Sequence, residues 1–139
     1  MEPALHASDQ PQQVMPLLAD YDRWLAFLTA CRLATRHYDQ QLKRIKRTNP
    51  QLETLSNYLR DCMRHRTVFF GKLATLLATR TDQLRTDPTN ADLVQRLTHA
   101  HPVLQLMIGQ LTTAFAEIED AYQSFPFLTT RDTPPVIQN

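Results

Sequence analysis

Two proline-containing breaks, Asn49-Pro50 and Asp87-Pro88, bound a long segment in which apolar residues recur at three- and four-residue steps. This periodicity places the apolar side chains on one side of a helix, whereas a strand would need a period of two. With Leu52 as heptad position a, the apolar residues fill most of positions a, d and e. They are Leu52, Leu55, Leu59, Cys62, Met63, Phe69, Phe70, Leu73, Leu76, Leu77 and Leu84. The stripe is wider than a two-stranded seam, so we expect this middle helix to face two neighbouring helices.

The segments on both sides of the middle helix carry the same kind of heptad pattern. Apolar positions run from Val14 to Ile45 before the first break and from Val94 to Phe125 after the second. Because both breaks are short, consecutive helices must turn back on each other. The sequence therefore predicts an all-α fold, an elongated antiparallel three-helix bundle. The predicted helices span residues 14–47, 50–86 and 91–125.

Polar residues at the breaks are typical of helix N-caps. Asn49 or Thr48 can cap the middle helix, and Asn90, Thr89 or Asp92 can cap the third. These residues favour helix starts close to the two prolines of the breaks.

Pro102 lies inside the third helical pattern. A proline there removes one backbone hydrogen bond and clashes with the carbonyl four residues earlier, so we expect a kink near His99. The heptad pattern keeps its phase across the proline, which favours one kinked helix over two separate helices.

The chain has 139 residues, enough for one domain with a substantial core, and its two glycines argue against a turn-rich β fold. We expect residues 14–128 to form a single helical domain. Residues 1–13 are predicted to be a flexible lead-in and residues 129–139 a flexible tail, because both are polar and contain prolines.

The short breaks also predict which residues lie at the same height. Residue i should face about residue 98 − i across the first turn and about residue 177 − i across the second, since both helices rise equally per residue. Cys31 then lies beside about residue 67, which is too far from Cys62 for a disulfide.

The charges of the chain nearly balance, with 15 basic and 14 acidic residues and a net charge of +1. Such a balance gives no general attraction to nucleic acid or to anionic membranes. We find no apolar run of about 18 residues and no signal-peptide pattern at the N-terminus. We therefore expect a cytoplasmic protein that does not enter a membrane.

Cysteine and histidine residues are the only candidate metal ligands that stand out. Cys62 and His65 share one side of the middle helix, whereas His99 and His101 point in different directions and lie far from Cys62 in the predicted register. We therefore expect no metal, no cofactor and no catalytic residues. A metal or redox protein using Cys62 and the histidines remains the third hypothesis.

Basic residues gather around the first break. The candidate polyanion contacts are Lys43, Arg44, Lys46, Arg47, Arg60 and Arg64. They support an alternative function, a nucleic-acid-binding accessory subunit that uses the cluster between residues 43 and 66. The predicted register places four acidic residues at the same end of the bundle, which reduces its positive potential. These are Glu53, Glu117, Glu119 and Asp120.

Several large apolar residues fall outside the heptad stripes, and a contiguous patch of them would mark a partner surface. They are Phe27, Leu33, Tyr58, Val68, Val103 and Leu106. The predicted interface lies at mid-height of the bundle and comprises Phe27, Val68, Gly71 and Leu106. Our first hypothesis is a non-enzymatic helical interaction protein, namely a homo-oligomeric assembly subunit, an adaptor or a helix-binding chaperone. Its partner is a protein, either a second copy or another chain.

Overall fold

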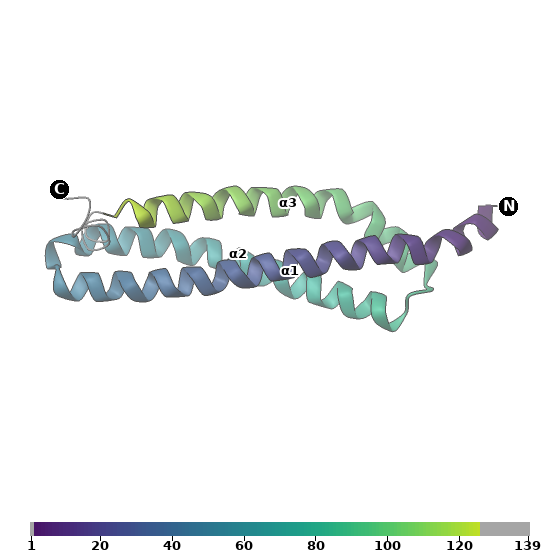
Figure 1. The fold of residues 1–139 in the computed structure, drawn as a ribbon, viewed down its shortest axis with the longest axis horizontal. Helices are drawn as coiled ribbons and strands as arrows, with labels where there is room; N and C mark the ends of the chain where they lie inside the picture. Colours follow the sequence, from purple (N-terminus) through teal and green to yellow (C-terminus); the bar gives the residue numbers. More distant parts are fainter. Residues whose placement is uncertain (1, 126–139) are drawn as a thin grey trace, which may run out of the picture.

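The computed structural model describes the backbone of residues 2–125 and the side chains of residues 13–125. Its elements are α1 (Glu2–Thr48), the 3₁₀ turn η1 (Pro50–Leu52), α2 (Glu53–Thr86) and α3 (Ala91–Gln123). α1 and α2 form an antiparallel hairpin, and α3 returns beside them in the direction of α1 (Figure 1). The described residues contain no strand, and the predicted elongated three-helix bundle is confirmed.

The first helix begins earlier than expected. α1 starts at Glu2, whereas the sequence predicted a start at residue 14. A proline such as Pro16 removes one backbone donor, but the bonded turns on both sides can continue the helix past it. The flexibility of residues 1–13 stays a prediction, and the predicted tail at 129–139 lies outside the described residues.

The two breaks end their helices differently. At the first break, Thr48 Oγ1 donates to the carbonyls of Arg44 and Ile45, and the Asn49 side chain makes no capping bond. At the second break, Asn90 Oδ1 accepts a 3.0 Å hydrogen bond from the backbone N–H of Leu93. The predicted cap by Asn90 is therefore confirmed, whereas the predicted cap of the middle helix is wrong.

Two apolar clusters form the core. The larger includes the first half of α1, from Val14 to Cys31, and the smaller surrounds Ile45 and Ile118 near the first turn. Between them Thr35 is buried, and its hydroxyl lies 3.5 Å from that of Thr67. Heptad positions a and e of α2 supply its largest buried apolar side chains. These are Leu59, Met63, Phe70, Leu73, Leu77 and Leu84.

The predicted register is right for the first hairpin. Arg60 Nε donates to Asp39 Oδ1 at 2.8 Å, and Ser56 Oγ donates to the Leu42 carbonyl at 3.0 Å. Both contacts join residues that the short first turn places at nearly the same height.

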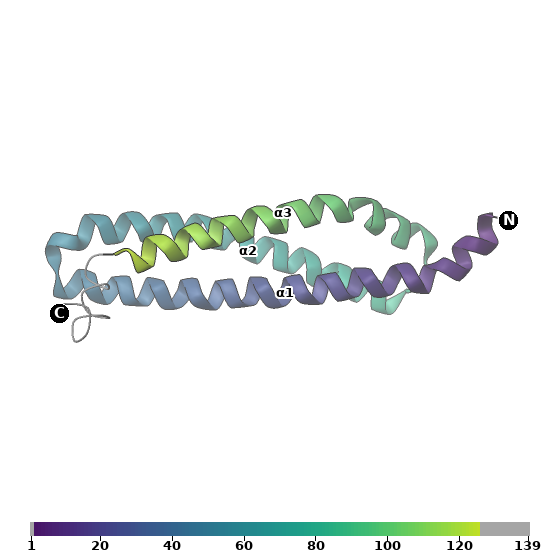
Figure 2. The same ribbon diagram turned by 45° about the horizontal axis from the view of Figure 1, so that its top comes forward.

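The predicted register of α2 and α3 is wrong. Arg66 pairs with Glu117 at 3.5 Å, whereas the predicted register placed Arg66 level with residue 111. Phe70 packs against Phe115, whereas the predicted register placed Phe70 level with residue 107. The last turns of α2 and the first turns of α3 spread apart around residues 87–90 (Figures 1 and 2), so the turn does not set the height of α3.

Contacts with α1 set the height of α3 instead. His101 contacts Asp20 and Glu119 contacts Tyr38, and both pairs are 81 residues apart in sequence. The equal offset means that α1 and α3 stay in parallel register along the bundle. α3 continues as one helix through Pro102, with a bend in its first half that both ribbon views show.

Candidate functional site

An apolar groove runs between α2 and α3. It encloses about 510 Å³ and is lined by Phe69, Lys72, Leu73 and Leu76 of α2 and by Met107, Gln110, Leu111 and Ala114 of α3. Each helix contributes residues at i, i+3, i+4 and i+7, the spacing of one helical face. The groove is therefore walled by two parallel stripes of side chains. We call it the α2–α3 groove.

Large apolar side chains in and beside this groove are exposed. Phe69 is 62% exposed and Met107 is 39% exposed, although the heptad pattern placed both at core position d. On the neighbouring face of α3, Val103 is 61% and Leu106 is 63% exposed. Within residues 2–125, α1 and α3 are the only long helices that can pack against α2, so its stripe extends beyond the surface that they cover. The prediction that position d lies in the core is wrong here.

The four residues of the predicted interface differ in exposure. Phe27 is half-buried and packs against the larger core cluster, whereas Val68 and Leu106 are exposed. A Cβ atom added to Gly71 would have no neighbour within 4 Å, so this glycine does not mark a close approach of another helix. The other off-stripe residues are exposed as predicted; they are Leu33, Tyr58, Val68, Val103 and Leu106.

A second groove, between α1 and α2, has a different chemistry. It encloses about 240 Å³ and is lined by Arg32, Thr35, Arg36 and Asp39 of α1 and by Arg60, Met63, Arg64 and Thr67 of α2. We call it the α1–α2 groove. Among the described residues, Asp39 is the only carboxylate that lines this groove. Sequence analysis singled out Arg60 and Arg64 but missed Arg32 and Arg36, whose positions one helical turn apart were a readable signal.

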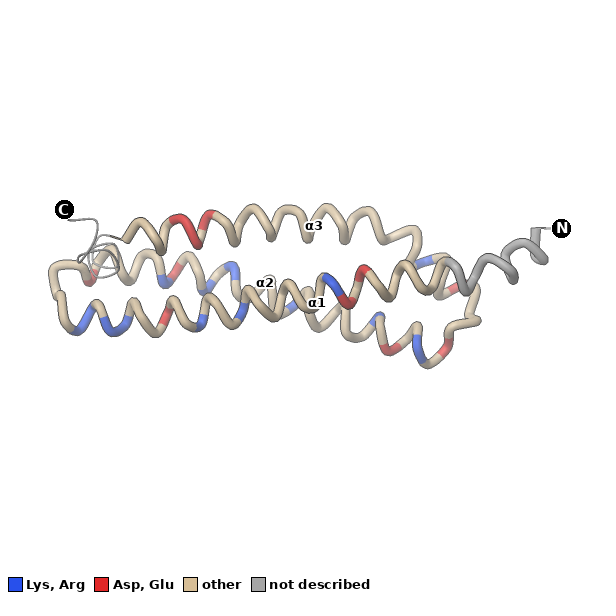
Figure 3. The backbone as a smooth tube through the Cα atoms, in the orientation of Figure 1, with Lys and Arg blue, Asp and Glu red and all other residues tan. Residues whose placement is uncertain are grey.

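The other predicted polyanion contacts are partly paired. Lys43 lies 3.6 Å from Asp39, and Lys46 lies 3.9 Å from Glu53. Arg44 and Arg47 are exposed near the end of α1. In Figure 3 these basic residues occupy one edge of the bundle, and the acidic residues of α3 occupy the opposite edge.

Part of the basic cluster pairs with carboxylates, and some of these partners differ from those that the predicted register gave. Arg60 pairs with Asp39 at 2.8 Å rather than with Glu117, which instead pairs with Arg66. Glu119 accepts a 3.2 Å hydrogen bond from the Tyr38 hydroxyl. The shifted register of α3 explains why these partners differ from those expected.

A hydrogen-bonded site around Asp20 joins α1 to α3 beside the bend and was not predicted. His101 Nε2 lies 2.7 Å from Asp20 Oδ2, and Arg23 Nη2 lies 2.7 Å from Asp20 Oδ1. The His101 ring stacks on Trp24 with their centroids 4.9 Å apart. Burial alone would raise the pKa of Asp20, but hydrogen bonds from His101 and Arg23 outweigh it and lower that pKa. The sequence prediction used only antiparallel neighbours. Parallel contacts between the first and third helices would have pointed to the pair of Asp20 and His101.

Cys31 is a buried thiol without the environment of a reactive cysteine. Burial, with a smaller contribution from Glu119, raises the pKa of the Cys31 thiol to about 11, so it remains protonated near neutral pH. Cys31 and Cys62 are both free thiols. Among the described residues, no group of three or more His, Cys, Asp or Glu side chains is arranged to hold a metal ion.

No protein-family model matches the chain, and no curated protein or solved structure is significantly similar to it. No helix in the described part of the chain combines the length and the apolar character needed to cross a bilayer. The chain is a helical protein with exposed apolar residues that suggest an interaction surface.

Proposed function

We propose that this protein is a non-enzymatic helical interaction protein whose α2–α3 groove binds one amphipathic helix of a partner protein. The observation that carries the proposal is the apolar lining of the groove, including the exposed side chains of Phe69 and Met107. Exposed apolar side chains concentrated in one concave site are typical of recognition surfaces.

The shape of the groove favours a helix as the occupant. Two walls with i, i+3, i+4 and i+7 spacing present the ridges against which another helix packs. A helix seated there would complete a four-helix bundle and bury its apolar stripe in the groove. Fully burying a side chain such as that of Phe69 is worth about 1.5–3 kcal/mol, from which the cost of association must be subtracted.

A separate chain fits the groove better than a second copy of this protein. In a two-fold dimer the same surface meets itself, so the hollow of one copy would lie against the hollow of the other. A single helix can enter the hollow from outside. Lys72 lines the groove, so we expect the partner helix to carry an acidic residue beside its apolar stripe. Subunit, adaptor and chaperone roles would all use this contact.

The test measures binding of a synthetic amphipathic helix with leucines at heptad positions a and d and glutamates beside them. Fluorescence anisotropy should show saturable binding to the wild-type chain. The double variant Phe69→Asp/Met107→Asp should weaken it at least tenfold, because a charge in the groove must lose water to accept the peptide. Leu33→Asp is the matched control, since Leu33 is 57% exposed and lies on α1 away from the groove.

Light scattering on the same variants distinguishes the possible occupants. A monomeric wild type that binds the peptide supports the proposal. A wild-type dimer that dissociates in the double variant would assign the groove to a second copy and overturn it. Equal peptide binding by the groove variant and the Leu33→Asp control would also overturn it.

A nucleic-acid-binding accessory subunit is the second candidate. The exposed side chains of Arg44 and Arg47 favour it, whereas the pairing of Lys43, Lys46 and Arg60 with carboxylates weighs against it. Retention on heparin resin, lost in Arg44→Ala/Arg47→Ala and steeply dependent on salt, would promote this candidate above the first.

A further inference from the structure

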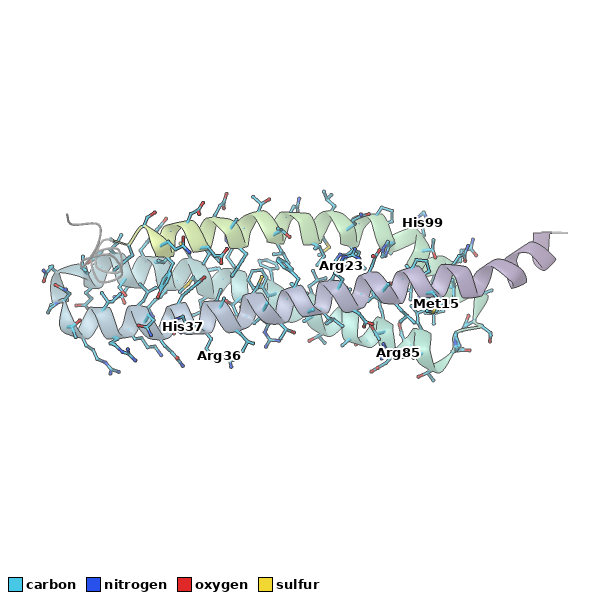
Figure 4. All side chains as sticks on the ribbon, in the orientation of Figure 1. Met15, Arg23, Arg36, His37, Arg85 and His99 are labelled. Atoms are coloured by element: carbon cyan, nitrogen blue, oxygen red, sulfur yellow. The ribbon has the colours of Figure 1, made fainter. Side chains whose placement is uncertain are left out.

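Four arginines from two helices line the α1–α2 groove. Arg32 and Arg36 lie one turn apart on α1, and Arg60 and Arg64 lie one turn apart on α2. The antiparallel register places Arg36 and Arg64 at about the same height, as the contacts of Arg60 with Asp39 and of Thr67 with Thr35 show. Arg32 and Arg60 lie about one turn away from that height, in opposite directions along the groove. Figure 4 shows Arg36 pointing away from α3, on the free side of the bundle.

The carboxylates near the groove offset the charge of the α2 arginines but not that of the α1 arginines. Asp39, which lines it, already pairs with Arg60 and Lys43, and Arg64 pairs with Asp61 at 3.2 Å. Among residues 13–125, no carboxylate lies within 4.0 Å of the guanidinium groups of Arg32 or Arg36. Like charges one helical turn apart repel each other, so this arrangement weakens the isolated fold.

We propose that the α1–α2 groove binds a small phosphorylated ligand, with Arg32 and Arg36 supplying free guanidinium groups. Guanidinium groups bind phosphate oxygens through paired N–H donors. The groove encloses about 240 Å³, compared with about 30 Å³ for one water in the liquid, so it can take a multi-atom anion. A phosphate group there would neutralise the repulsion between the arginines. The α2–α3 groove lies elsewhere, so either proposal can fail without the other.

Pyrophosphate is the probe, titrated calorimetrically into the full chain, with inorganic phosphate and a single-stranded oligonucleotide in parallel. We expect saturable pyrophosphate binding that weakens at least tenfold in Arg32→Gln/Arg36→Gln. The matched control is Arg44→Gln/Arg47→Gln, which removes the same charge from exposed positions of the same helix outside the groove. The control should bind within twofold of the wild type.

Circular dichroism verifies that both double variants fold, which is expected because all four arginines are exposed. Absence of pyrophosphate binding at millimolar concentration would overturn the proposal. Equal weakening in the two double variants would also overturn it, because the binding would then reflect diffuse charge. Binding of the oligonucleotide without binding of pyrophosphate would overturn it in favour of the nucleic-acid candidate.

Discussion

The two grooves on either side of α2 differ in both chemistry and volume. The α1–α2 groove is basic, and polar contacts join its two helices, including Ser56 to Leu42 and Arg60 to Asp39. The α2–α3 groove is mainly apolar. α1 holds α3 in place through His101 and Tyr38, so the walls of the α2–α3 groove need not close on each other. α2 thus contributes side chains to two grooves of different chemistry, one on each side.

Substitutions of two adjacent phenylalanines of α2 test this comparison, and they have the largest expected effect on stability. Phe70 is fully buried against Phe115, whereas Phe69 is exposed in the α2–α3 groove. Phe70→Ala should lower the free energy of unfolding by about 3–5 kcal/mol because it leaves a cavity. Phe69→Ala should change it by about 0.5 kcal/mol or less. Urea denaturation measures both, and equal losses would mean that Phe69 belongs to the core and not to a binding groove.

The contacts of Asp20 with His101 and Arg23, which join α1 to α3, give the second prediction. Asp20→Asn removes a carboxylate bonded to His101 and Arg23, and should cost about 1.5–3 kcal/mol of unfolding free energy at neutral pH. Thermal denaturation of both proteins at neutral pH measures this difference. No change would show that the position of α3 does not depend on this pair.

The same variant should change the acid dependence of stability. The folded state lowers the pKa of Asp20 below its ordinary value of 3.8, so its stabilisation is present above pH 3.8 and is lost as the pH falls through the lowered folded pKa. The wild type should therefore lose more stability than Asp20→Asn below pH 3.8. Denaturation between pH 5 and pH 2, compared at equal ionic strength, follows this loss. Parallel curves for the two proteins would contradict the assignment.

A polar contact between α1 and α2, nearer the first turn than the α1–α2 groove, gives a smaller prediction. Ser56 is fully buried, and its hydroxyl donates to the Leu42 carbonyl across the hairpin. Ser56→Ala should cost about 0.5–1.5 kcal/mol, the net value of one such bond. Ser124→Ala, at the exposed end of α3, is the control and should cost less. A larger loss of stability in Ser124→Ala than in Ser56→Ala would mean that the hydroxyl of Ser56 does not stabilise the hairpin.

The smallest expected effect is a gain of stability at Gly71. A Cβ atom there meets nothing within 4 Å, so Gly71→Ala should stabilise α2 by about 0.5–1 kcal/mol through its higher helix propensity. Peptide binding to the α2–α3 groove should stay unchanged. A weaker affinity of the Gly71→Ala variant for the peptide would mean that Gly71 lies in the binding interface, as the sequence predicted.

Local signals in the sequence were enough to predict the helices and the first hairpin. The heptad stripes, the proline breaks and the Asn90 cap depend on neighbouring residues, so they can be read from the chain itself. The exposure of Leu33, Tyr58 and Leu106 followed from the same periodicity. Of the α1–α2 groove, only Arg60 and Arg64 were recognised, because the basic cluster was defined by closeness in sequence to the first break.

The sequence by itself therefore determined three helices, their boundaries near the breaks, and the height at which α1 meets α2. Only the tertiary structure decided where α3 sits, because its contacts with α1 outweigh the geometry of the 87–90 turn. That position leaves Phe69 and Met107 uncovered although their heptad positions mark them as core. Periodicity fixes which face of a helix is apolar, but whether that face is buried depends on how many helices pack around it.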